Sequence, residues 1–257
     1  MALSLSACLR DKPYGDGDDT GGNTPSGETA YTLGSPVSYS TNLDGLSAIC
    51  LNEAGNGLLI ARDNGDVLEY DLDGSRMATN TMPNPDGRSK VDLEGITKAA
   101  DGSIYLCEER FREVWKLNAD HKGMTLLSKG PTEAQNEDNQ GFEGIAAGPD
   151  GLLYVANQSK PFRVYTYSTK TKAWGTAFDV TWAQSLSDIY FDVDDGTLWI
   201  TDAKTQKLTQ LKTDGTVIRN IDISFVKKPE GFCKDAARKL FWFVCDKENK
   251  IYKVSYK

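Results

Sequence analysis

The sequence predicts an all-β fold, a single β-propeller with five four-stranded blades. A four-residue motif recurs at residues 43–46, 93–96, 142–145, 186–189 and 229–232. Its first and fourth residues are apolar, its second is polar or acidic, and its third is Gly or Asp. The second position falls at 44, 94, 143, 187 and 230, so the spacings are 50, 49, 44 and 43 residues. This period is typical of propeller blades, whose repeats run about 40–50 residues.

Strand signals follow each motif in the same order. Apolar runs rich in β-branched and aromatic residues, which favour strands, occur at residues 58–60, 104–106, 152–155, 198–200 and 240–244. Asn-Gly or Asp-Gly pairs, which favour tight hairpins, begin at residues 56, 101, 150 and 195. A third strand is predicted at residues 67–70, 114–117, 164–167, 208–211 and 251–254. No stretch combines a helical period with caps at both ends, so we expect little helix.

The two ends of the repeat region indicate how the ring closes. The fifth repeat reaches Lys257 directly after its third strand, and residues 31–39 precede the first motif without a blade of their own. We therefore expect residues 31–39 to supply the outer strand of the last blade, which would close the ring and cover a sheet edge. The alternative is an open five-repeat β-sheet array or a sandwich.

The first 30 residues predict an anchor and a tether. Residues 5–8 (LSAC) resemble a bacterial lipobox, in which Cys8 is acylated, although no basic residue precedes Cys8. We interpret residues 1–8 as the end of a lipoprotein signal, with an ordinary cysteine as the alternative. Residues 9–30 are acidic and rich in Gly, which predicts a flexible tether, and residues 31–257 form the propeller. No run approaches the ~18 apolar residues that a membrane helix needs.

Charge and histidine content exclude several classes of function. The chain has 37 acidic and 29 basic residues, a formal charge of −8, and one histidine. Nucleic acids and anionic lipids need a cationic surface, so we expect no nucleic-acid partner and no membrane contact except through a lipid at Cys8. A multi-histidine metal site is excluded because its ligands are missing.

Acidic residues recur where the first strand of each blade begins and where the second ends. These points share one rim of the ring because the two strands are antiparallel. The first set is Asp44, Glu94, Glu143, Ser187 with Asp188, and Glu230, and the second is Asp63, Glu108 or Glu109, Asn157, Asp202 and Asp246. Carboxylates gathered this closely repel each other, which bound protons or a hard cation relieve. Oxygen ligands favour Ca²⁺ or Mg²⁺ over zinc, while the alternative is that each acid caps a turn.

The ordered motifs resemble those of the bacterial SdiA-regulated (YjiK-like) family over about residues 40–257. The matching segments are residues 42–46, 92–97 with 108–110, 138–145, 186–189 and 229–232. The resemblance implies a five-bladed propeller with a calcium site, commonly in a cell-envelope protein, and no established enzymatic activity. By motif match it implies that Glu94, Glu143 and Glu230 are metal ligands or channel-lining groups, followed by Glu109 and Asp188. Asp44 departs from the pattern, since the family often has a small polar residue there.

The remaining reactive side chains predict structural roles. His121 falls in the turn between the third and fourth strands of its blade, so we expect it exposed on the opposite rim, without a Ser-His-Asp triad. Arg110, Arg112 and Lys160 fall near the acidic rim, where they pair with carboxylates or hold an anionic ligand. Apolar sequence surrounds Cys50, Cys107, Cys233 and Cys245, which predicts small buried hydrophobes and leaves a disulfide open. A hairpin centred near residue 237 pairs Cys233 with about Phe241, not with Cys245.

Two functions are consistent with the sequence. The first is a monomeric calcium-binding propeller of the cell envelope, lipid-anchored at Cys8, that binds a small molecule or an envelope protein at its acidic rim without catalysis. The absence of a nucleophile–base pair favours it. The alternative is a metal-assisted hydrolase of an ester, lactone or glycoside that uses the rim carboxylates. This alternative rests on analogy of fold.

Overall fold

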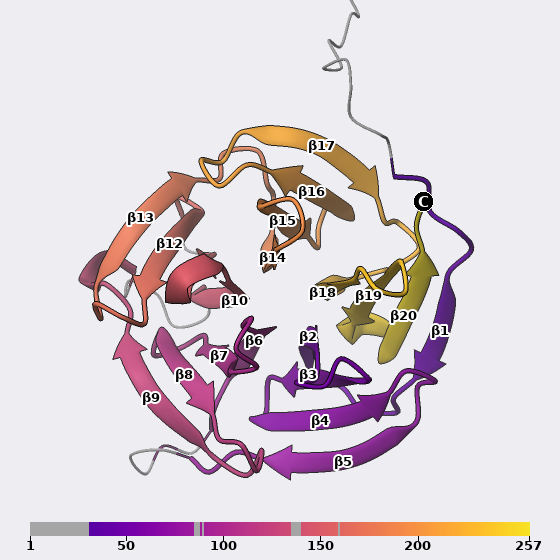
Figure 1. Cartoon of the computed structure of the whole chain (residues 1–257), viewed down its shortest axis with the longest axis horizontal. Helices are drawn as coiled ribbons and strands as arrows, with labels where there is room; N and C mark the ends of the chain where they lie inside the picture. Colours follow the sequence, from indigo (N-terminus) through magenta and orange to yellow (C-terminus); the bar gives the residue numbers. More distant parts are fainter. Residues whose placement is uncertain (1–30, 85–87, 89, 135–139, 159) are drawn as a thin grey trace, which may run out of the picture. The chain divides into compact units, whose positions relative to one another are not determined.

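Twenty strands form five antiparallel four-stranded sheets arranged as blades around a ring in the computed structural model (Figure 1). The structure describes residues 31–257 except 85–87, 89, 135–139 and 159, so the predicted lipobox, Cys8 and the tether lie outside the described residues. Helical structure in the described residues is limited to three short 3₁₀ turns, and none of their helices is long and apolar enough to cross a membrane. The predicted five-bladed propeller is confirmed.

Each blade places its first strand nearest the ring axis and its fourth strand outermost (Figure 1). Blade 1 consists of β2 (Leu46–Leu51), β3 (Gly57–Arg62), β4 (Asp66–Asp71) and β5 (Arg76–Thr81). Blade 2 consists of β6 (Leu93–Lys98), β7 (Ile104–Glu108), β8 (Glu113–Leu117) and β9 (Met124–Lys129). Blade 3 consists of β10 (Phe142–Ala147), β11 (Leu152–Asn157), β12 (Arg163–Ser168) and β13 (Trp174–Asp179). Blade 4 consists of β14 (Leu186–Asp192), β15 (Thr197–Asp202), β16 (Lys207–Leu211) and β17 (Val217–Asp222).

Blade 5 combines the two ends of the described chain. It consists of β18 (Pro229–Asp235), β19 (Leu240–Cys245), β20 (Lys250–Ser255) and β1 (Val37–Ser40). β1 lies antiparallel to β20, with Val37 opposite Lys253 and Ser40 opposite Lys250. The Tyr31 ring packs 5.5 Å from that of Phe241, which adds apolar contact to the closure. The prediction that the segment before the first motif completes the last blade is confirmed.

The innermost strand of every blade begins with a β-bulge. Its register against the second strand shifts at one equivalent residue, namely Ser47, Glu94, Glu143, Ser187 or Glu230. A bulge leaves one residue out of the ladder and re-aims its side chain without ending the strand. Five equivalent side chains are therefore removed from ordinary pairing at the same point of each blade.

This register corrects the alignment of the first repeat. The sequence pattern aligned Asp44 with Glu94, but the structure places Ser47 at that position, three residues later. Gly45 adopts a positive φ of 66° and turns the chain just before β2. The Asp44 side chain is 89% exposed, and its Oδ1 lies 2.9 Å from Arg62 Nη2. Asp44 is therefore a surface residue, and a small polar residue occupies the position in the first blade.

Small residues after the bulge let neighbouring innermost strands approach each other closely. A Cβ atom on Gly144 would lie 2.7 Å from the Ile189 nitrogen, and one on Gly231 would lie 2.7 Å from the Ala48 Cα. Blade 4 has Asp188 at this position. Its two carboxylate oxygens accept hydrogen bonds from Ile189 N–H (2.8 Å) and Phe232 N–H (2.7 Å). Asp188 thereby joins β14 to β18 of the next blade.

The four cysteines of the described chain are buried free thiols, as their apolar surroundings predicted. The predicted hairpin register was off by one residue, because Cys233 lies opposite Trp242 and Phe241 lies opposite Lys234. Cys233 and Cys245 do not face each other in the sheet, as expected.

The single histidine lies in the predicted turn, but it is half-buried instead of exposed. His121 Nδ1 lies 2.8 Å from Glu69 Oε1 and Nε2 lies 2.7 Å from Glu53 Oε1. Burial acts to lower the pKa of His121, but the hydrogen bonds and charges of both glutamates outweigh it and raise the pKa. His121 in blade 2 therefore forms an ionic contact with two carboxylates of blade 1. The sequence pattern within one repeat does not predict such a contact between blades.

We expect His121→Gln to destabilise the protein only at low pH. The folded state raises the pKa of His121, so its stabilisation is complete below the unfolded value near 6.5 and is lost as pH rises through the folded value. The expected loss at pH 6 is about 1 kcal/mol, or roughly 2–4 °C in Tm. Thermal melts from pH 5.5 to 9, with exposed Lys122→Gln as control, test this prediction. A His121→Gln deficit that is independent of pH would contradict it.

Candidate functional site

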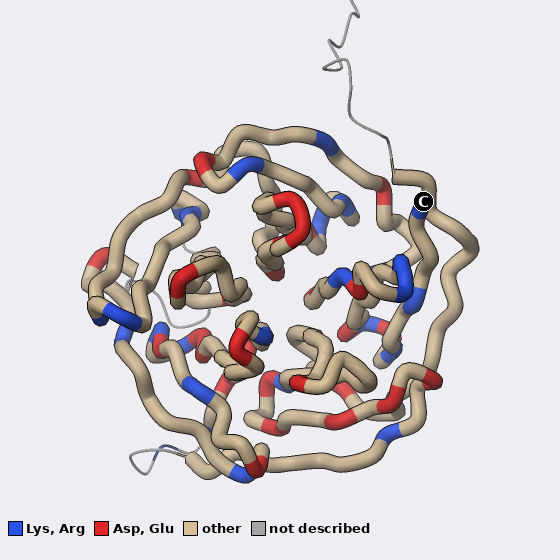
Figure 2. The backbone as a smooth tube through the Cα atoms, viewed as in Figure 1, with Lys and Arg blue, Asp and Glu red and all other residues tan. Residues whose placement is uncertain are grey.

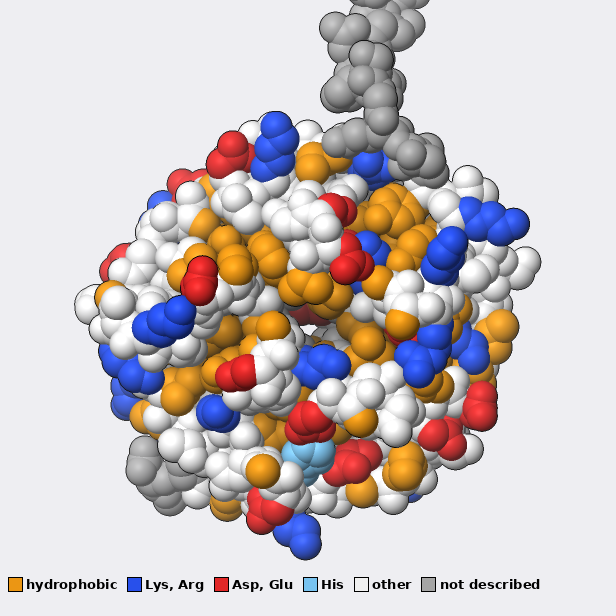
Figure 3. All heavy atoms as spheres, viewed as in Figure 1, with side chains coloured by type: hydrophobic (Ala, Val, Ile, Leu, Met, Phe, Trp, Pro, Cys, Tyr) orange, Lys and Arg blue, Asp and Glu red, His pale blue; other side chains and the backbone are white. Residues whose placement is uncertain are grey.

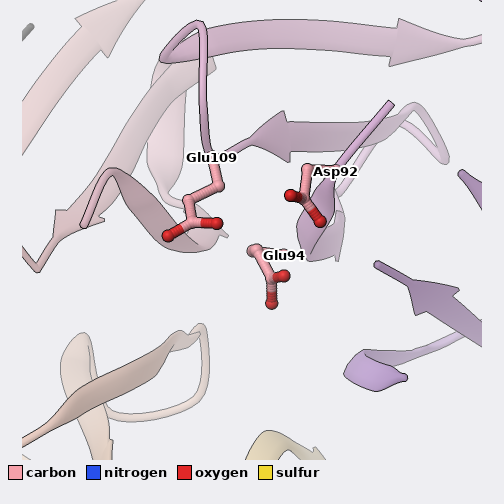
Figure 4. Close-up of side chains that lie close together, drawn as sticks. All are labelled: Asp92, Glu94 and Glu109. Atoms are coloured by element: carbon pink, nitrogen blue, oxygen red, sulfur yellow. The ribbon is translucent and has the colours of Figure 1, made fainter. Parts of the chain in front are cut away.

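Three carboxylates converge where β6 begins and β7 ends (Figure 4). Asp92 immediately precedes β6, Glu94 is the bulged residue of β6, and Glu109 directly follows β7. One oxygen atom from each residue lies within 4.8 Å of the other two. Asp92 and Glu109 are only 4% and 8% exposed. Among the described residues, these are the three acidic side chains whose oxygen atoms come close enough together to hold one metal ion.

Glu143 and Glu230 extend the cluster across the ring. Glu143 is the bulged residue of β10, and its carboxyl group lies close enough to that of Glu109 for the two to hydrogen-bond when one of them is protonated. A hydrogen bond between two carboxyl groups requires a shared proton. The charge of Glu230, the bulged residue of β18, acts on both Glu94 and Glu143. We call Asp92, Glu94, Glu109, Glu143 and Glu230 the acidic cluster.

Basic side chains compensate only part of the acidic cluster. Asp92 lies 2.6 Å from Arg110 Nε and 3.4 Å from Lys90 Nζ. Glu230 lies 2.7 Å from Lys228 Nζ, which also contacts Asp246 at 3.0 Å. Within the described part of the chain, Glu94, Glu109 and Glu143 form no ion pair with a basic side chain. Three neighbouring carboxylates are therefore without a direct counter-charge.

The pKa values of the acidic cluster reflect this imbalance. Burial raises the pKa of Glu94 and Glu143 well above the usual value, and their acidic neighbours raise both further. Burial followed by the charge of Asp92 raises the pKa of Glu109. Burial also raises that of Glu230, against the opposing charge of Lys228. The cluster favours the uptake of a positive charge, whether a proton or a metal ion.

A glycine shapes the contact between Glu109 and Glu143. A Cβ atom on Gly141 would overlap the Glu109 carbonyl oxygen, so only glycine permits this approach of the two segments. The Gln158 N–H donates to the Gly141 carbonyl at 2.8 Å and fixes the segment before β10. The backbone thus places Glu109 beside the bulge of β10.

The structure brings together four of the five residues predicted as metal ligands: Glu94, Glu109, Glu143 and Glu230. Asp188 lies in the same ring of strands, but backbone N–H groups already contact both of its oxygens, and its role as a ligand stays a prediction. Sequence reasoning missed Asp92. The available signal was its place two residues before Glu94, at the start of the motif of the second blade.

The acids at the ends of the second strands mostly cap turns, which was the alternative interpretation for each of them. Glu108 accepts a hydrogen bond from Phe111 N–H at 2.7 Å, and burial raises its pKa to about 7. Asp202 accepts from three backbone N–H groups, and Asp246 accepts from Gly45 N–H at 2.9 Å. Figure 2 shows acidic residues at turns all around the ring, so the net charge alone does not mark the site.

The basic residues near the acidic cluster have different roles. Arg110 pairs with Asp92, which confirms the predicted pairing with a carboxylate. Arg112 is 3% exposed and donates from Nη1 to the Arg110 carbonyl at 2.7 Å. Lys160 is exposed. Their contacts favour stabilisation of the β7–β8 connection and of Asp92 over capture of an anion by Arg110.

Solved structures similar to this chain share its fold. Virginiamycin B lyase from Staphylococcus aureus is 15% identical, with a TM-score of 0.54 over 88% of this chain and 99% of the lyase. A gluconolactonase from Xanthomonas campestris is 11% identical, with a TM-score of 0.56 over 83% of this chain and 86% of that protein. A protein of unknown function from Bacteroides thetaiotaomicron is 11% identical, with a TM-score of 0.59 over 87% and 76%.

Family comparisons support the resemblance seen in the motifs. The SdiA-regulated family model matches residues 178–257, which confirms that resemblance for the last part of the chain. No curated protein matches the sequence. The phytase-like family model, described as esterase-like activity of phytase, matches residues 41–191, which is more than half of the 257 residues. The chain therefore belongs to the phytase-like family, and its residues 178–257 match the SdiA-regulated family model.

Proposed function

We propose that this propeller binds Ca²⁺ at the acidic cluster and acts as a ligand-binding module of the cell envelope. The observation that carries the proposal is the group of Glu94, Glu109 and Glu143, neighbouring carboxylates without an ion-pair partner in the described chain, of which Glu109 and Glu143 are buried and Glu94 is partly buried. A divalent cation supplies the missing charge.

The donor set fits calcium. Calcium takes oxygen ligands at 2.3–2.6 Å, so two oxygens on one ion lie up to about 5 Å apart. The oxygens of Asp92, Glu94 and Glu109 lie within 4.8 Å of one another, which this geometry permits. Glu143 and Glu230 complete the set that would hold the ion. Oxygen-only donors favour Ca²⁺ or Mg²⁺ over zinc, and calcium tolerates the irregular arrangement better than magnesium does.

The module proposed here is monomeric and lipid-anchored at Cys8, with a small molecule or an envelope protein bound at the acidic cluster. The lipobox-like residues 5–8 and the Gly-rich segment that follows support the anchor. The acidic cluster supports a ligand that contacts a bound cation or carries positive charge itself. Globomycin treatment of a producing bacterium, which blocks lipoprotein signal cleavage, would shift the mass of an anchored protein and leave an unanchored one unchanged.

Calcium is expected to raise the melting temperature of the intact chain. With a Kd on the order of 10 µM, 1 mM Ca²⁺ stabilises the folded state by about 2.7 kcal/mol, or roughly 5–10 °C for a domain of this size. Glu94→Gln is expected to remove most of this rise, because it removes a carboxylate oxygen from the centre of the cluster. The measurement is a thermal melt in EDTA, in Ca²⁺ and in Mg²⁺. Asp73→Asn, an exposed turn acid of blade 1, is the control that keeps the full response.

Metal-assisted hydrolysis of an ester or lactone is the second candidate function. Membership of a family described as esterase-like activity of phytase favours it, and a gluconolactonase shares the fold. A bound calcium ion would polarise a carbonyl oxygen and lower the pKa of water. In this protein Glu109 and Glu143, two neighbouring carboxyl groups with raised pKa values, are the pair placed to exchange a proton.

Hydrolysis assays separate the two candidates. Purified protein with Ca²⁺ is incubated with p-nitrophenyl acetate and with δ-gluconolactone, and Glu143→Gln serves as the comparison. Turnover that requires Ca²⁺ and falls at least about a hundredfold in Glu143→Gln supports the hydrolase. Calcium binding without turnover of either substrate supports the binding module. The absence of any Ca²⁺ response in the melts contradicts both.

A further inference from the structure

The central channel also opens on the face opposite the acidic cluster, where the innermost strands end, and this opening forms a pocket. The pocket has a volume of about 540 Å³ and is lined by the ends of all five innermost strands and by the turns that follow four of them, β2, β6, β14 and β18. Figure 3 looks onto the face with the histidine, and hydrophobic side chains surround the central opening there. A volume of this size lies within the range of small-molecule sites in proteins.

Apolar side chains form the inner wall of this pocket. Ile96, Ile145, Ile189 and Phe232 are buried and occupy the same position of four innermost strands, two residues after each bulge. Val193, in the turn after β14, is 67% exposed at the edge of the pocket. An exposed valine beside a buried apolar wall gives an apolar ligand additional surface to cover.

Lys98 is the charged group in this pocket that lacks a carboxylate partner. It is half-buried, and its Nζ donates to the Asn52 carbonyl oxygen at 3.0 Å. Among the described residues it forms no ion pair, so two of its three N–H donors are available. Lys98 lines the pocket together with Cys50 and Cys233, and its positive charge opposes the rise that burial causes in the pKa of both thiols.

The other charged side chains around the pocket leave Lys98 without an ion-pair partner, because they pair with one another or lie in solvent. Lys234 pairs with buried Asp192, and Arg238 pairs with Asp235 at 2.9 Å. Asp194 is exposed to water, where solvent screens its charge. The pocket therefore presents one available cation at the side of an apolar cavity.

We propose that this opening binds a small amphipathic organic anion, an acid with one apolar ring system or chain. The apolar part occupies the cavity formed by the four buried side chains, and the acid group contacts Lys98. Charge complementarity and the combination of a single cation with an apolar wall carry the proposal. It is independent of calcium, because no residue of the acidic cluster lines this pocket.

Two related fluorescent probes test the proposal on the intact chain in EDTA. The probe 8-anilinonaphthalene-1-sulfonate carries a sulfonate, and N-phenyl-1-naphthylamine has the same apolar skeleton without it. The variants are Lys98→Met, which removes the charge and keeps the length, Lys98→Arg, which keeps the charge, and Val193→Asp. Lys170→Met, an exposed lysine of blade 3, is the control. Thermal melts establish that each variant is folded.

We expect one sulfonate probe per folded chain, with binding weakened tenfold or more in Lys98→Met and nearly unchanged in Lys98→Arg and Lys170→Met. The neutral probe is expected to bind wild type and Lys98→Met alike, while Val193→Asp weakens both probes. Equal loss of both probes in Lys98→Met would overturn the role of the charge. Failure of wild type to bind either probe, or binding unaffected by Lys98→Met and Val193→Asp, would overturn the site. Since EDTA is present throughout, none of these results depends on the calcium proposal.

Discussion

Alanine in place of Asp188 is expected to lower the free energy of unfolding by about 2–4 kcal/mol, because it leaves two buried N–H groups without acceptors. Those groups belong to Ile189 in blade 4 and Phe232 in blade 5, and both residues are 2% exposed. Water cannot replace the lost acceptor unless the two innermost strands separate. Urea denaturation of wild type and variant at pH 7, with 1 mM EDTA in both samples, measures the difference.

Two companion variants identify the cause of that loss. Asp188→Asn keeps the shape and one acceptor oxygen but points an amide donor at a backbone N–H, so we expect an intermediate loss. Asp194→Ala changes an exposed acid in the turn after β14 and is expected to fall within about 0.5 kcal/mol of wild type. If Asp188→Ala were as stable as wild type, relief from burying a charge would outweigh both hydrogen bonds. The link between blades 4 and 5 would then rest on apolar packing alone.

The sequence predicts the blades well because the period, the turns and the strand pattern agree with one another. Each Asp-Gly or Asn-Gly pair fixes a hairpin, and the apolar run after it is buried, as in β11 and β15. Even the closing strand β1 follows from the missing fourth strand of the last repeat. The turn signal occurs in four repeats and the strand pattern in all five, so an error in one repeat does not change the fold.

The register within one blade is predicted less reliably. Both Asp44-Gly45 and Ser47-Ala48 resemble the second and third motif positions, and the acidic residue made the first alignment attractive. The bulge at Ser47 decides between them, and a bulge depends on pairing with β3 across the hairpin. The four-residue motif alone does not specify how β2 pairs with β3.

The composition of the site is predictable in part for a similar reason. Glu94, Glu143 and Glu230 share a motif position, so the topology alone brings them to one end of the channel. Asp92 and the pairing of Glu230 with Lys228 depend on the paths of the loops before β6 and β18. Likewise, the contacts of His121 with Glu53 and Glu69 connect two blades and leave no periodic signal in the sequence. Contacts within a repeat are encoded locally, and contacts between repeats are not.

The double variant Glu109→Gln/Glu143→Gln is expected to change the sign of its stability effect with calcium. Without calcium, wild type holds these buried carboxyl groups beside Glu94 and Asp92, and their repulsion is only partly relieved by a shared proton. Two amides keep the shape and can hydrogen-bond to each other, so the variant is expected to be more stable in EDTA by about 1–2 kcal/mol.

With 5 mM Ca²⁺ the order reverses, because wild type with a Kd of about 10 µM gains about 3.7 kcal/mol, whereas a variant whose affinity is weakened about a hundredfold gains only about 1 kcal/mol. Urea denaturation in 1 mM EDTA and in 5 mM Ca²⁺ measures both differences, and Asp73→Asn/Asp120→Asn is the control that removes two exposed turn acids. The control is expected to respond to calcium as wild type does, so that its stability difference from wild type is the same in both buffers. A double variant that is more stable in both buffers would mean that the acidic cluster repels but binds no ion. One that is less stable in both would mean that the Glu109–Glu143 hydrogen bond contributes more to the fold than their repulsion removes.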